Sequence, residues 1–177
     1  MQPVELFRHC PRCGSELPNR ANPLHCPACG LRYFFNPTCA AAGFLRDDDG
    51  RTLFIRRAKE PAKGKLAVPG GFIDIGETAE EALRRETLEE VGVTIADIRY
   101  VCSCTNLYPY AGVLYPVVDV IFTARAVNPE AAEPLDGVAG LAWLRPAEVN
   151  EGELAFPSLM KAWKLLKKPL PQAGGML

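Results

Sequence analysis

The stretch that decides the fold is Gly71 to Val93, GFIDIGETAEEALRRETLEEVGV, a glycine-containing loop that runs into an acidic helix. Glu86, Glu89 and Glu90 follow one another at helical spacing, which places their carboxylates on one face. Carboxylates that repel each other on one short face are stabilised by a hard divalent cation, which prefers oxygen ligands. The stretch therefore predicts a metal site with open coordination positions, of the kind that phosphoryl chemistry uses.

The sequence also marks the two ends of this helix. Thr78 and Glu81 form a capping box at its start, and Gly92 supplies the residue that ends it. Arg85 lies four residues before Glu89 and can order the acids by pairing with them. A helical projection predicts a buried stripe made of Leu83, Thr87, Leu88 and Val91. The alternative is a solvated amphipathic helix, but the glycine-containing loop and the spacing of the acids favour a site.

Strands and turns surround this helix. Apolar runs predict strands at residues 39–46, 51–57, 66–71, 97–107, 113–127 and 141–144, and a helical pattern predicts a helix at 156–168. The first two strands form a hairpin around an aspartate-rich turn. Pro116 predicts that its strand lies at a sheet edge or begins after a bulge. Asp119 interrupts the same apolar strand, so it is either held by a structural hydrogen bond or belongs to a site.

A basic segment precedes the acidic helix. Its cations are Arg56, Arg57, Lys63 and Lys65. They form either an ordinary solvated loop or a clamp for phosphate oxygens, and we take Arg56 and Lys65 as candidate substrate-binding residues. The glycine pair Gly70-Gly71 follows, and its small size lets the backbone approach a ligand closely.

Four cysteines near the N-terminus form two CPxCG knuckles: Cys10, Cys13, Cys26 and Cys29. Two such pairs close a tetrahedral shell around Zn²⁺, and the glycine after each pair allows the tight turn that this requires. Two disulfides or four free thiols are the alternative. Residues 1–36 are therefore predicted to be a small zinc ribbon whose metal is structural. The aromatic residues at 33–35 either pack at the junction with the next domain or line a ligand pocket there.

The composition excludes several classes of protein. The chain has 177 residues, of which 48% are hydrophobic and 23% are charged, so it has room for one ordinary domain and a small appendage. The net charge of −1 gives no global attraction to nucleic acid or to anionic membranes. No run approaches the ~18 apolar residues of a membrane span. Seven cysteines, four of them in knuckles, and an N-terminus without an apolar signal core lead us to expect a cytoplasmic protein.

The acidic helix and its loop resemble the Nudix box. That pattern has a glycine, then a glutamate, an Arg-Glu pair, a Glu-Glu pair and a final glycine with an aliphatic residue. The chain has these in register at Gly71, Glu77, Arg85-Glu86, Glu89-Glu90, Gly92 and Val93. It departs from the pattern at Thr87, where an aliphatic residue is usual. With the cysteine knuckles in front, the chain resembles the zinc-ribbon branch of the family, which includes NADH pyrophosphatases.

This resemblance implies a fold and a chemistry. The fold is a Nudix α/β/α sandwich with a mixed sheet at residues 37–168, after the zinc ribbon and before a tail at 169–177. The activity is hydrolysis of a nucleoside diphosphate linked to another moiety, releasing a mononucleotide. Mg²⁺ or Mn²⁺ is implied at Glu86, Glu89 and Glu90, with the Gly70 carbonyl as a further ligand. Glu86 or a loop acid such as Glu133 is the general base that the resemblance implies.

The substrate and partners stay open. NADH pyrophosphatases carry a Ser-Gln-Pro-Trp stretch after the box, but this chain has SCTNLYPY at residues 103–110, so ADP-ribose and FAD are at least as good candidates as NADH. Tyr108, Tyr110 and Phe35 are the candidates for stacking on a base. One alternative is a zinc-ribbon nucleic-acid binder or nucleotide-sensing regulator, and another is a hydrolase of nucleotide-capped RNA. Relatives in this branch are commonly homodimers, and no nucleic-acid partner is expected.

Overall fold

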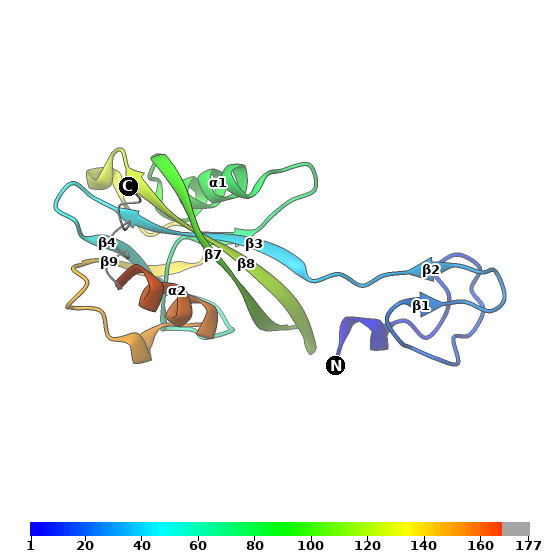
Figure 1. Cartoon of the computed structure of the whole chain (residues 1–177). Helices are drawn as coiled ribbons and strands as arrows, with labels where there is room; N and C mark the ends of the chain where they lie inside the picture. Colours follow the sequence, from blue (N-terminus) through cyan, green and yellow to red (C-terminus); the bar gives the residue numbers. More distant parts are fainter. Residues whose placement is uncertain (168–177) are drawn as a thin grey trace, which may run out of the picture.

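A computed structural model describes residues 1–167 of the chain. The chain folds into a small N-terminal ribbon and a larger α/β body, each with its own hydrophobic cluster (Figure 1). The tail predicted at 169–177 lies outside the described residues. No described helix is long and apolar enough to cross a membrane.

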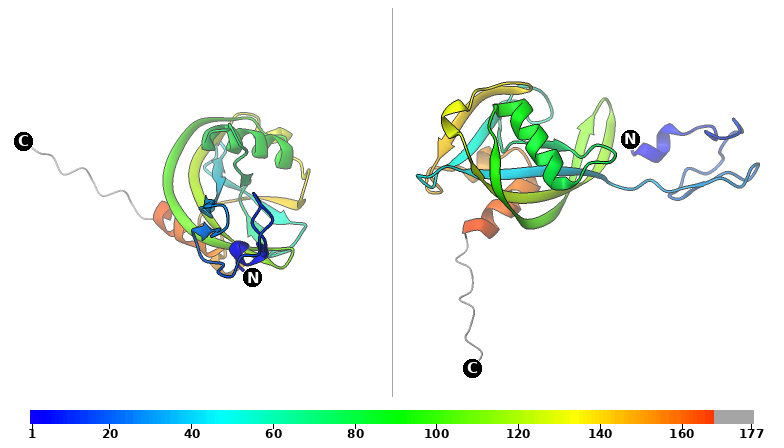
Figure 2. Two further views of the ribbon diagram at one scale, coloured as in Figure 1. Left: turned by 90° about the vertical axis from the view of Figure 1, so that its right-hand side faces the viewer. Right: turned by 90° about the horizontal axis from the view of Figure 1, so that it is seen from above.

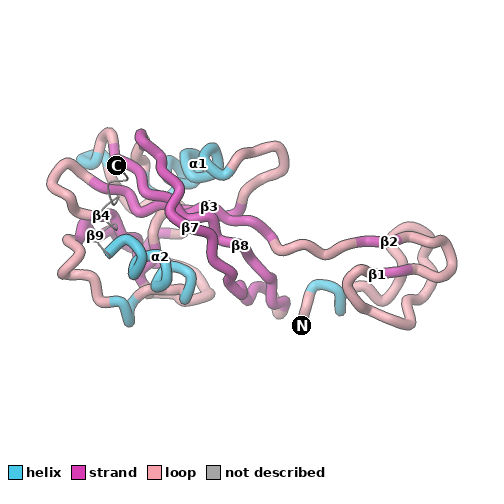
Figure 3. The backbone as a smooth tube through the Cα atoms, viewed as in Figure 1, coloured by secondary structure: helices cyan, strands magenta, loops and turns pink. Residues whose placement is uncertain are grey.

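The body is built on one mixed sheet. Its strands are β3 (Thr38–Arg46), β4 (Thr52–Arg57), β5 (Leu66–Ala67), β6 (Gly70–Phe72), β7 (Ile95–Tyr110), β8 (Val113–Ala126) and β9 (Val138–Leu144). They run in the order β5-β4-β3-β8-β7, with β6 paired to β3 and β9 paired to β4. The β3–β8 pair is parallel and the other pairs are antiparallel, and the hairpin predicted from the first two strands is confirmed. Figure 3 shows how these strands curl around the body.

One helix covers each face of this sheet, as Figures 1 and 2 show. The helices are α1 (Ala79–Val91) and α2 (Pro157–Lys167), and two single turns, η2 (Pro129–Ala131) and η3 (Glu151–Glu153), lie in the loops between β8 and α2. Gly43 of β3 faces α1, because a Cβ there would lie 2.9 Å from Leu83 Cδ1. The next residue, Phe44, faces α2, with its ring centroid 5.4 Å from that of Trp163. The predicted α/β/α sandwich is confirmed.

Of the two positions predicted for the strand with Pro116, the sheet edge is wrong, because this strand is an inner one. β8 lies between β3 and β7. Its pairing with β3 begins only at Val117, opposite Thr38. Pro116 therefore has no β3 neighbour, and its missing N–H costs no hydrogen bond on that side. The proline marks the point where the third strand joins, rather than the edge of the sheet.

The ends of α1 are confirmed and one part of its predicted face is wrong. Thr78 and Glu81 form the capping box, and Gly92 ends the helix with a left-handed φ of 68°. Leu88 is 53% exposed, however, and Ala82 is buried in its place. At 100° per residue, Leu88 lies roughly 140° from Leu83, whereas Glu86 and Glu90 lie on the Leu83 side. The covered face of the helix therefore includes two glutamates.

The ribbon packs around its own short sheet, β1 (Leu24–His25) with β2 (Arg32–Tyr33), which follows the first turn η1 (Pro3–Leu6). Phe35 packs inside the ribbon, with its ring 5.1 Å from that of Phe7. The junction aromatic thus packs, and it does not reach the cavity described below. The chain start also touches the body, because Leu114 N donates to Met1 O at 2.8 Å.

Candidate active site

The four knuckle cysteines come together in the ribbon. The sulfurs of Cys10, Cys13, Cys26 and Cys29 all lie within 4.8 Å of one another. Gly14 and Gly30 adopt left-handed φ values of 74° and 72° and close the two turns by donating to Cys10 O and Cys26 O. Hydrogen bonding with the side chain and backbone of Ser15 lowers the pKa of Cys13 to about 6, which favours the thiolate that metals bind.

This arrangement fits Zn²⁺. Four thiols at the corners of one small volume are the donor set of a closed structural site. Four thiolate ligands would leave no open coordination position, so a metal held there would be structural. The ribbon buries few side chains of its own, so a bound metal would supply much of its folding free energy.

Arg85 holds the acids of the Nudix-like stretch together. Its Nε donates to Glu77 at 2.9 Å, and one terminal nitrogen donates to Glu86 at 2.8 Å and to Glu89 at 3.1 Å. The other terminal nitrogen donates to the Phe72 carbonyl at 3.0 Å. The hydrogen bond from Arg85 lowers the pKa of Glu77, while Glu77 and then Glu86 raise the pKa of Arg85. The helix is thereby tied to the loop before it.

Glu77 is a residue that sequence reasoning did not assign to the site. Both carboxylate oxygens of Glu77 accept hydrogen bonds from the Arg85 guanidinium, at 2.9 and 3.0 Å. A planar guanidinium recognises a carboxylate in this way. The fixed place of Glu77 in the Nudix-like pattern was the signal that could have identified it.

The side chains of Glu86 and Glu90 are partly buried, whereas that of Glu89 is exposed. The Gly70 amide donates to Glu90 Oε2 at 3.0 Å. Burial raises the pKa of Glu90 to about 8, and the neighbouring Glu86 adds to the rise. Burial also raises the pKa of Glu86, against the effect of Arg85. The side chain of Glu89 is 54% exposed and points to Arg85 at the surface.

These carboxylates fit a divalent cation. Among residues 1–167, only the cysteine set has three or more metal-ligating atoms gathered within 4.8 Å, so the three glutamates do not form a closed cage. Instead Glu86 and Glu89 contact Arg85, and Glu90 contacts the backbone of Gly70. Two half-covered carboxylates whose ionised form is disfavoured by burial are the groups that a hard cation stabilises. The donor set is all oxygen, which suits Mg²⁺ or Mn²⁺.

A cavity of about 330 Å³ opens beside these glutamates. Its lining combines both partly buried carboxylates, the double glycine and two cations with aromatic and polar side chains from the sheet and with Phe156, which precedes α2. The residues that matter for its chemistry are Gly70, Gly71, Glu86, Glu90, Arg57, Lys59, Asn106, Tyr108, Tyr110, Asp119 and Phe156. The cavity therefore offers a cation site, positive charge and a flat aromatic wall in one enclosure.

The cations that line this cavity are not the two proposed from sequence. Arg56 contacts Glu153 at 3.3 Å and Lys65 donates to the Gly152 carbonyl at 3.1 Å, so both point toward η3. Arg57 and Lys59 line the cavity instead. Successive side chains of a strand point to opposite faces, so the residue after Arg56 faces the cavity.

Two of the three aromatic residues predicted to stack on a base lie at the cavity, and the third does not. Tyr108 and Tyr110 line the cavity. The Tyr108 hydroxyl accepts from Arg57 at 3.3 Å, and its ring lies 5.6 Å from that of Phe72. Arg57 also stacks over Phe156 at 5.1 Å. Phe35 packs in the ribbon and has no place here.

The loop acid Glu133 is exposed, and its backbone amide contacts the Val91 carbonyl. Its carboxylate is not among the groups that line the cavity. Asp136 does not line the cavity either, but it pairs at 3.1 Å with Lys59, which does, and it adds to the raised pKa of Glu90. Two residues of loop separate these two acids, and Glu133 rather than Asp136 was named from the sequence.

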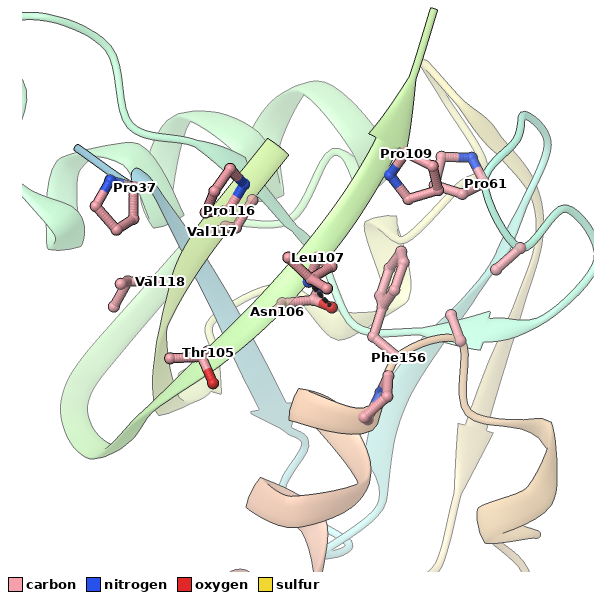
Figure 4. A pocket seen from close by; sticks show the side chains of 13 residues that line it. Pro37, Pro61, Thr105, Asn106, Leu107, Pro109, Pro116, Val117, Val118 and Phe156 are labelled. Carbon is pink, nitrogen blue, oxygen red and sulfur yellow. Dashed lines mark hydrogen bonds between the residues drawn. The ribbon is translucent and has the colours of Figure 1, made fainter. Parts of the chain in front are cut away.

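A second cavity, of about 630 Å³, borders the first and has a different character (Figure 4). Five prolines contribute to its wall, namely Pro37, Pro61, Pro109, Pro116 and Pro157. It shares Asn106, Val117 and Phe156 with the first cavity, and within residues 1–167 no charged side chain lines it. It offers apolar surface and no group for chemistry.

Known proteins resemble parts of this sequence. The NAD-capped RNA hydrolase NudC of Chromobacterium violaceum is 37% identical over 128 residues, which are 71% of this chain and 47% of that protein. The ADP-ribose pyrophosphatase of Methanocaldococcus jannaschii is 44% identical over 62 residues, 35% of this chain and 36% of that protein. The chain thus spans less than half the length of these two curated relatives.

Solved structures agree with the fold. A NUDIX hydrolase from Nitrosomonas europaea has a TM-score of 0.69 at 24% identity and covers 89% of both chains. The NUDIX domain of Shewanella oneidensis NrtR, solved with ADP ribose, has a TM-score of 0.62 at 25% identity over 75% of this chain and 88% of that one. The sequence profile of the NUDIX domain matches residues 37–165. With that match over most of the chain, and the acidic helix that lies within it, the chain belongs to the Nudix family.

Proposed function

We propose that this chain hydrolyses, with Mg²⁺ or Mn²⁺, the diphosphate of an adenosine diphosphate linked to a second moiety, and releases AMP. ADP-ribose, FAD and NADH all contain this unit. The observation that carries the proposal is that Glu86 and Glu90 share one cavity with Arg57, Lys59 and an aromatic wall. The names of the relatives, an ADP-ribose pyrophosphatase and an NAD-capped RNA hydrolase, are consistent with it.

The reaction needs charge neutralisation, a water and a proton acceptor. A divalent cation held by Glu86, Glu89, Glu90 and the Gly70 carbonyl would neutralise the diphosphate and make water more acidic. The oxygen of water bonds to one phosphorus while the bridging P–O bond breaks, and the bridging oxygen leaves with the other phosphate. Glu86 or Asp136 accepts the proton of the water, and Arg57 and Lys59 hold the phosphate oxygens.

A substrate panel tests this proposal. ADP-ribose, FAD, NADH and NAD⁺ are incubated with the protein and Mg²⁺ or Mn²⁺, and released AMP is measured. Glu90→Gln should lower kcat by on the order of 10²–10⁴-fold. Glu80→Gln is the matched control, because Glu80 lies on the exposed side of the same helix. Binding of a nucleotide without turnover by the wild type would instead support a nucleotide-sensing regulator.

A second candidate substrate is an RNA with a nucleotide cap. The similarity to NudC of Chromobacterium violaceum favours it, and the same adenosine diphosphate unit would enter the cavity. The discriminating measurement is the ratio of kcat/KM for NAD-capped RNA and for NAD⁺. A large ratio that falls steeply with salt would show that the RNA body is bound as well.

Two further properties stay proposals. The reduced knuckle cysteines support a cytoplasmic location. A homodimer is proposed from the resemblance to the zinc-ribbon branch, and its measurement is the molar mass in solution.

A further inference from the structure

The charged residue that β8 contributes to the cavity is Asp119. We propose that Asp119 and Asn106 recognise the nucleobase. Asp119 accepts a hydrogen bond from the exocyclic amine of adenine, and Asn106 donates to the neighbouring ring nitrogen. This inference rests on the proposed function, which brings an adenosine diphosphate into the cavity.

The surroundings of Asp119 leave its carboxylate available. Its cross-strand neighbours are Ala40 on β3 and Cys104 on β7, and neither has a side chain that spans the cavity. Within residues 1–167 it makes no ion pair within 4.0 Å. Burial raises the pKa of Asp119, while the Ser158 and Asn106 side chains oppose the rise. A carboxylate has about four acceptor positions, so these neighbours leave room for a ligand donor.

Asn106 is oriented as a donor. The Leu107 amide donates to Asn106 Oδ1 at 2.9 Å, a bond drawn in Figure 4. With its oxygen engaged, the side-chain amide has its two N–H groups left for other partners. Asn106 lines the cavity and is close enough to Asp119 to favour its ionised form. An acceptor beside a donor is the complement of adenine, whose amine adjoins a ring nitrogen.

The separation from the glutamates suits a nucleotide. Gly70, whose amide contacts Glu90, pairs with Ala42 on β3, and Asp119 pairs with Ala40 two residues away. Two strand spacings and a two-residue rise place Gly70 and Asp119 about 12 Å apart. An extended nucleoside diphosphate has a similar reach from base edge to outer phosphate. Base and diphosphate can thus occupy opposite ends of one cavity.

Aromatic side chains lie where the plane of a base would be held. Tyr108 is two residues from Asn106 on β7, so the two side chains share a face of the sheet. Its ring lies 5.6 Å from Phe72 and 6.0 Å from Phe156. Stacking holds any base, whereas the hydrogen bonds of Asp119 and Asn106 select among bases.

Binding of mononucleotides tests this inference without turnover. The affinities of AMP and of purine riboside 5′-monophosphate, which lacks the amine, are measured by calorimetry in EDTA. Wild type should bind AMP about tenfold to a hundredfold more tightly. Asp119→Leu, close in shape and without an acceptor, should bind both equally, and Asp119→Asn should lie between. Asp48→Asn, in the exposed turn after β3, is the control and should keep the full preference.

Several results would overturn the inference. They are equal binding of the two ligands by wild type, binding of neither, tighter binding of GMP than of AMP, or an equal loss of both ligands in Asp119→Leu. The last would show a structural role. Hydrolysis of ADP-ribose by the same proteins separates the two proposals. If Glu90→Gln abolishes turnover while wild type binds AMP and purine riboside 5′-monophosphate equally, only the base assignment fails. If wild type discriminates but hydrolyses no nucleotide, only the proposed reaction fails.

Discussion

Replacing Gly71 by alanine should disable the site while sparing the fold. A Cβ at this position would lie 2.7 Å from Glu86 Oε2, and closer still to the rest of that carboxylate. The backbone of Gly71 is not left-handed, so alanine is compatible with its conformation. The neighbouring Gly70 differs, because a Cβ there would overlap the backbone of β3. In Gly71→Ala, only the end of a side chain has to move.

The size of the effect follows from this overlap. Ordinary contact begins at 3.4 Å, so the carboxylate must move by roughly 1 Å, a displacement that costs about a hundredfold in rate for a catalytic group. The hydrogen bond from Arg85 to Glu86, 2.8 Å long, would be lost. That loss is about 1.5–3 kcal/mol, offset by about 0.4–1 kcal/mol from the stiffer unfolded chain. A net loss of ~1–2 kcal/mol lowers Tm by about 2–8 °C.

The assay compares kcat/KM for ADP-ribose and the thermal melt of Gly71→Ala with those of Gly140→Ala. No atom of the described residues 1–167 lies within 4 Å of a Cβ added at Gly140, which is also outside the site, so that variant should match wild type in both. Full activity in Gly71→Ala would refute the idea that the Glu86 carboxylate acts from its observed position. Loss of cooperative unfolding would refute the claim that only a side chain must shift.

Three further outcomes are expected. Arg85→Lys cannot keep the two-point contact with Glu77. It should lower the free energy of unfolding in urea titrations by ~2 kcal/mol and reduce kcat. An unchanged urea titration would contradict this prediction. Because the pKa of Asp119 is raised in the folded state, that state binds more protons than the unfolded one, and this residue lowers wild-type stability as pH rises above about 4. Asp119→Asn should therefore make the fall of stability with pH shallower, while the part due to Glu86 and Glu90 stays. Elemental analysis should find one zinc per chain. Removal of the zinc should leave the melt followed by tryptophan fluorescence unchanged, because both tryptophans, Trp143 and Trp163, belong to the body. A shifted melt would mean that the ribbon stabilises the body.

Features encoded within a few residues could be predicted from the sequence. The capping box at Thr78, the left-handed Gly92 and the cysteine knuckles each depend on neighbours in the chain, so their geometry follows from local chemistry. The same is true of the contact between Arg85 and Glu89, four residues apart on one helix.

Features that depend on the packing of distant segments could not be predicted. Lys65 contacts Gly152 and Arg56 contacts Glu153, both in a turn far along the chain. These contacts hold the two cations away from the cavity, and no residue near them in the sequence indicates this. The choice of Arg57 over Arg56 depends on which face of β4 meets the cavity, and pairing with β9 fixes that face.

The exposure of Leu88 and the cover over Glu90 have a common cause. The sequence pattern alone assigns the apolar residues of α1 to the core, yet the helix is turned so that Glu86 and Glu90 are covered and Leu88 is exposed. Covering carboxylates disfavours their ionised form and therefore opposes folding of the metal-free protein near neutral pH. A cation that binds them removes this cost, so metal affinity and stability are coupled through the same two side chains. The arrangement that weakens the empty helix is the one that gives the cavity its metal ligands.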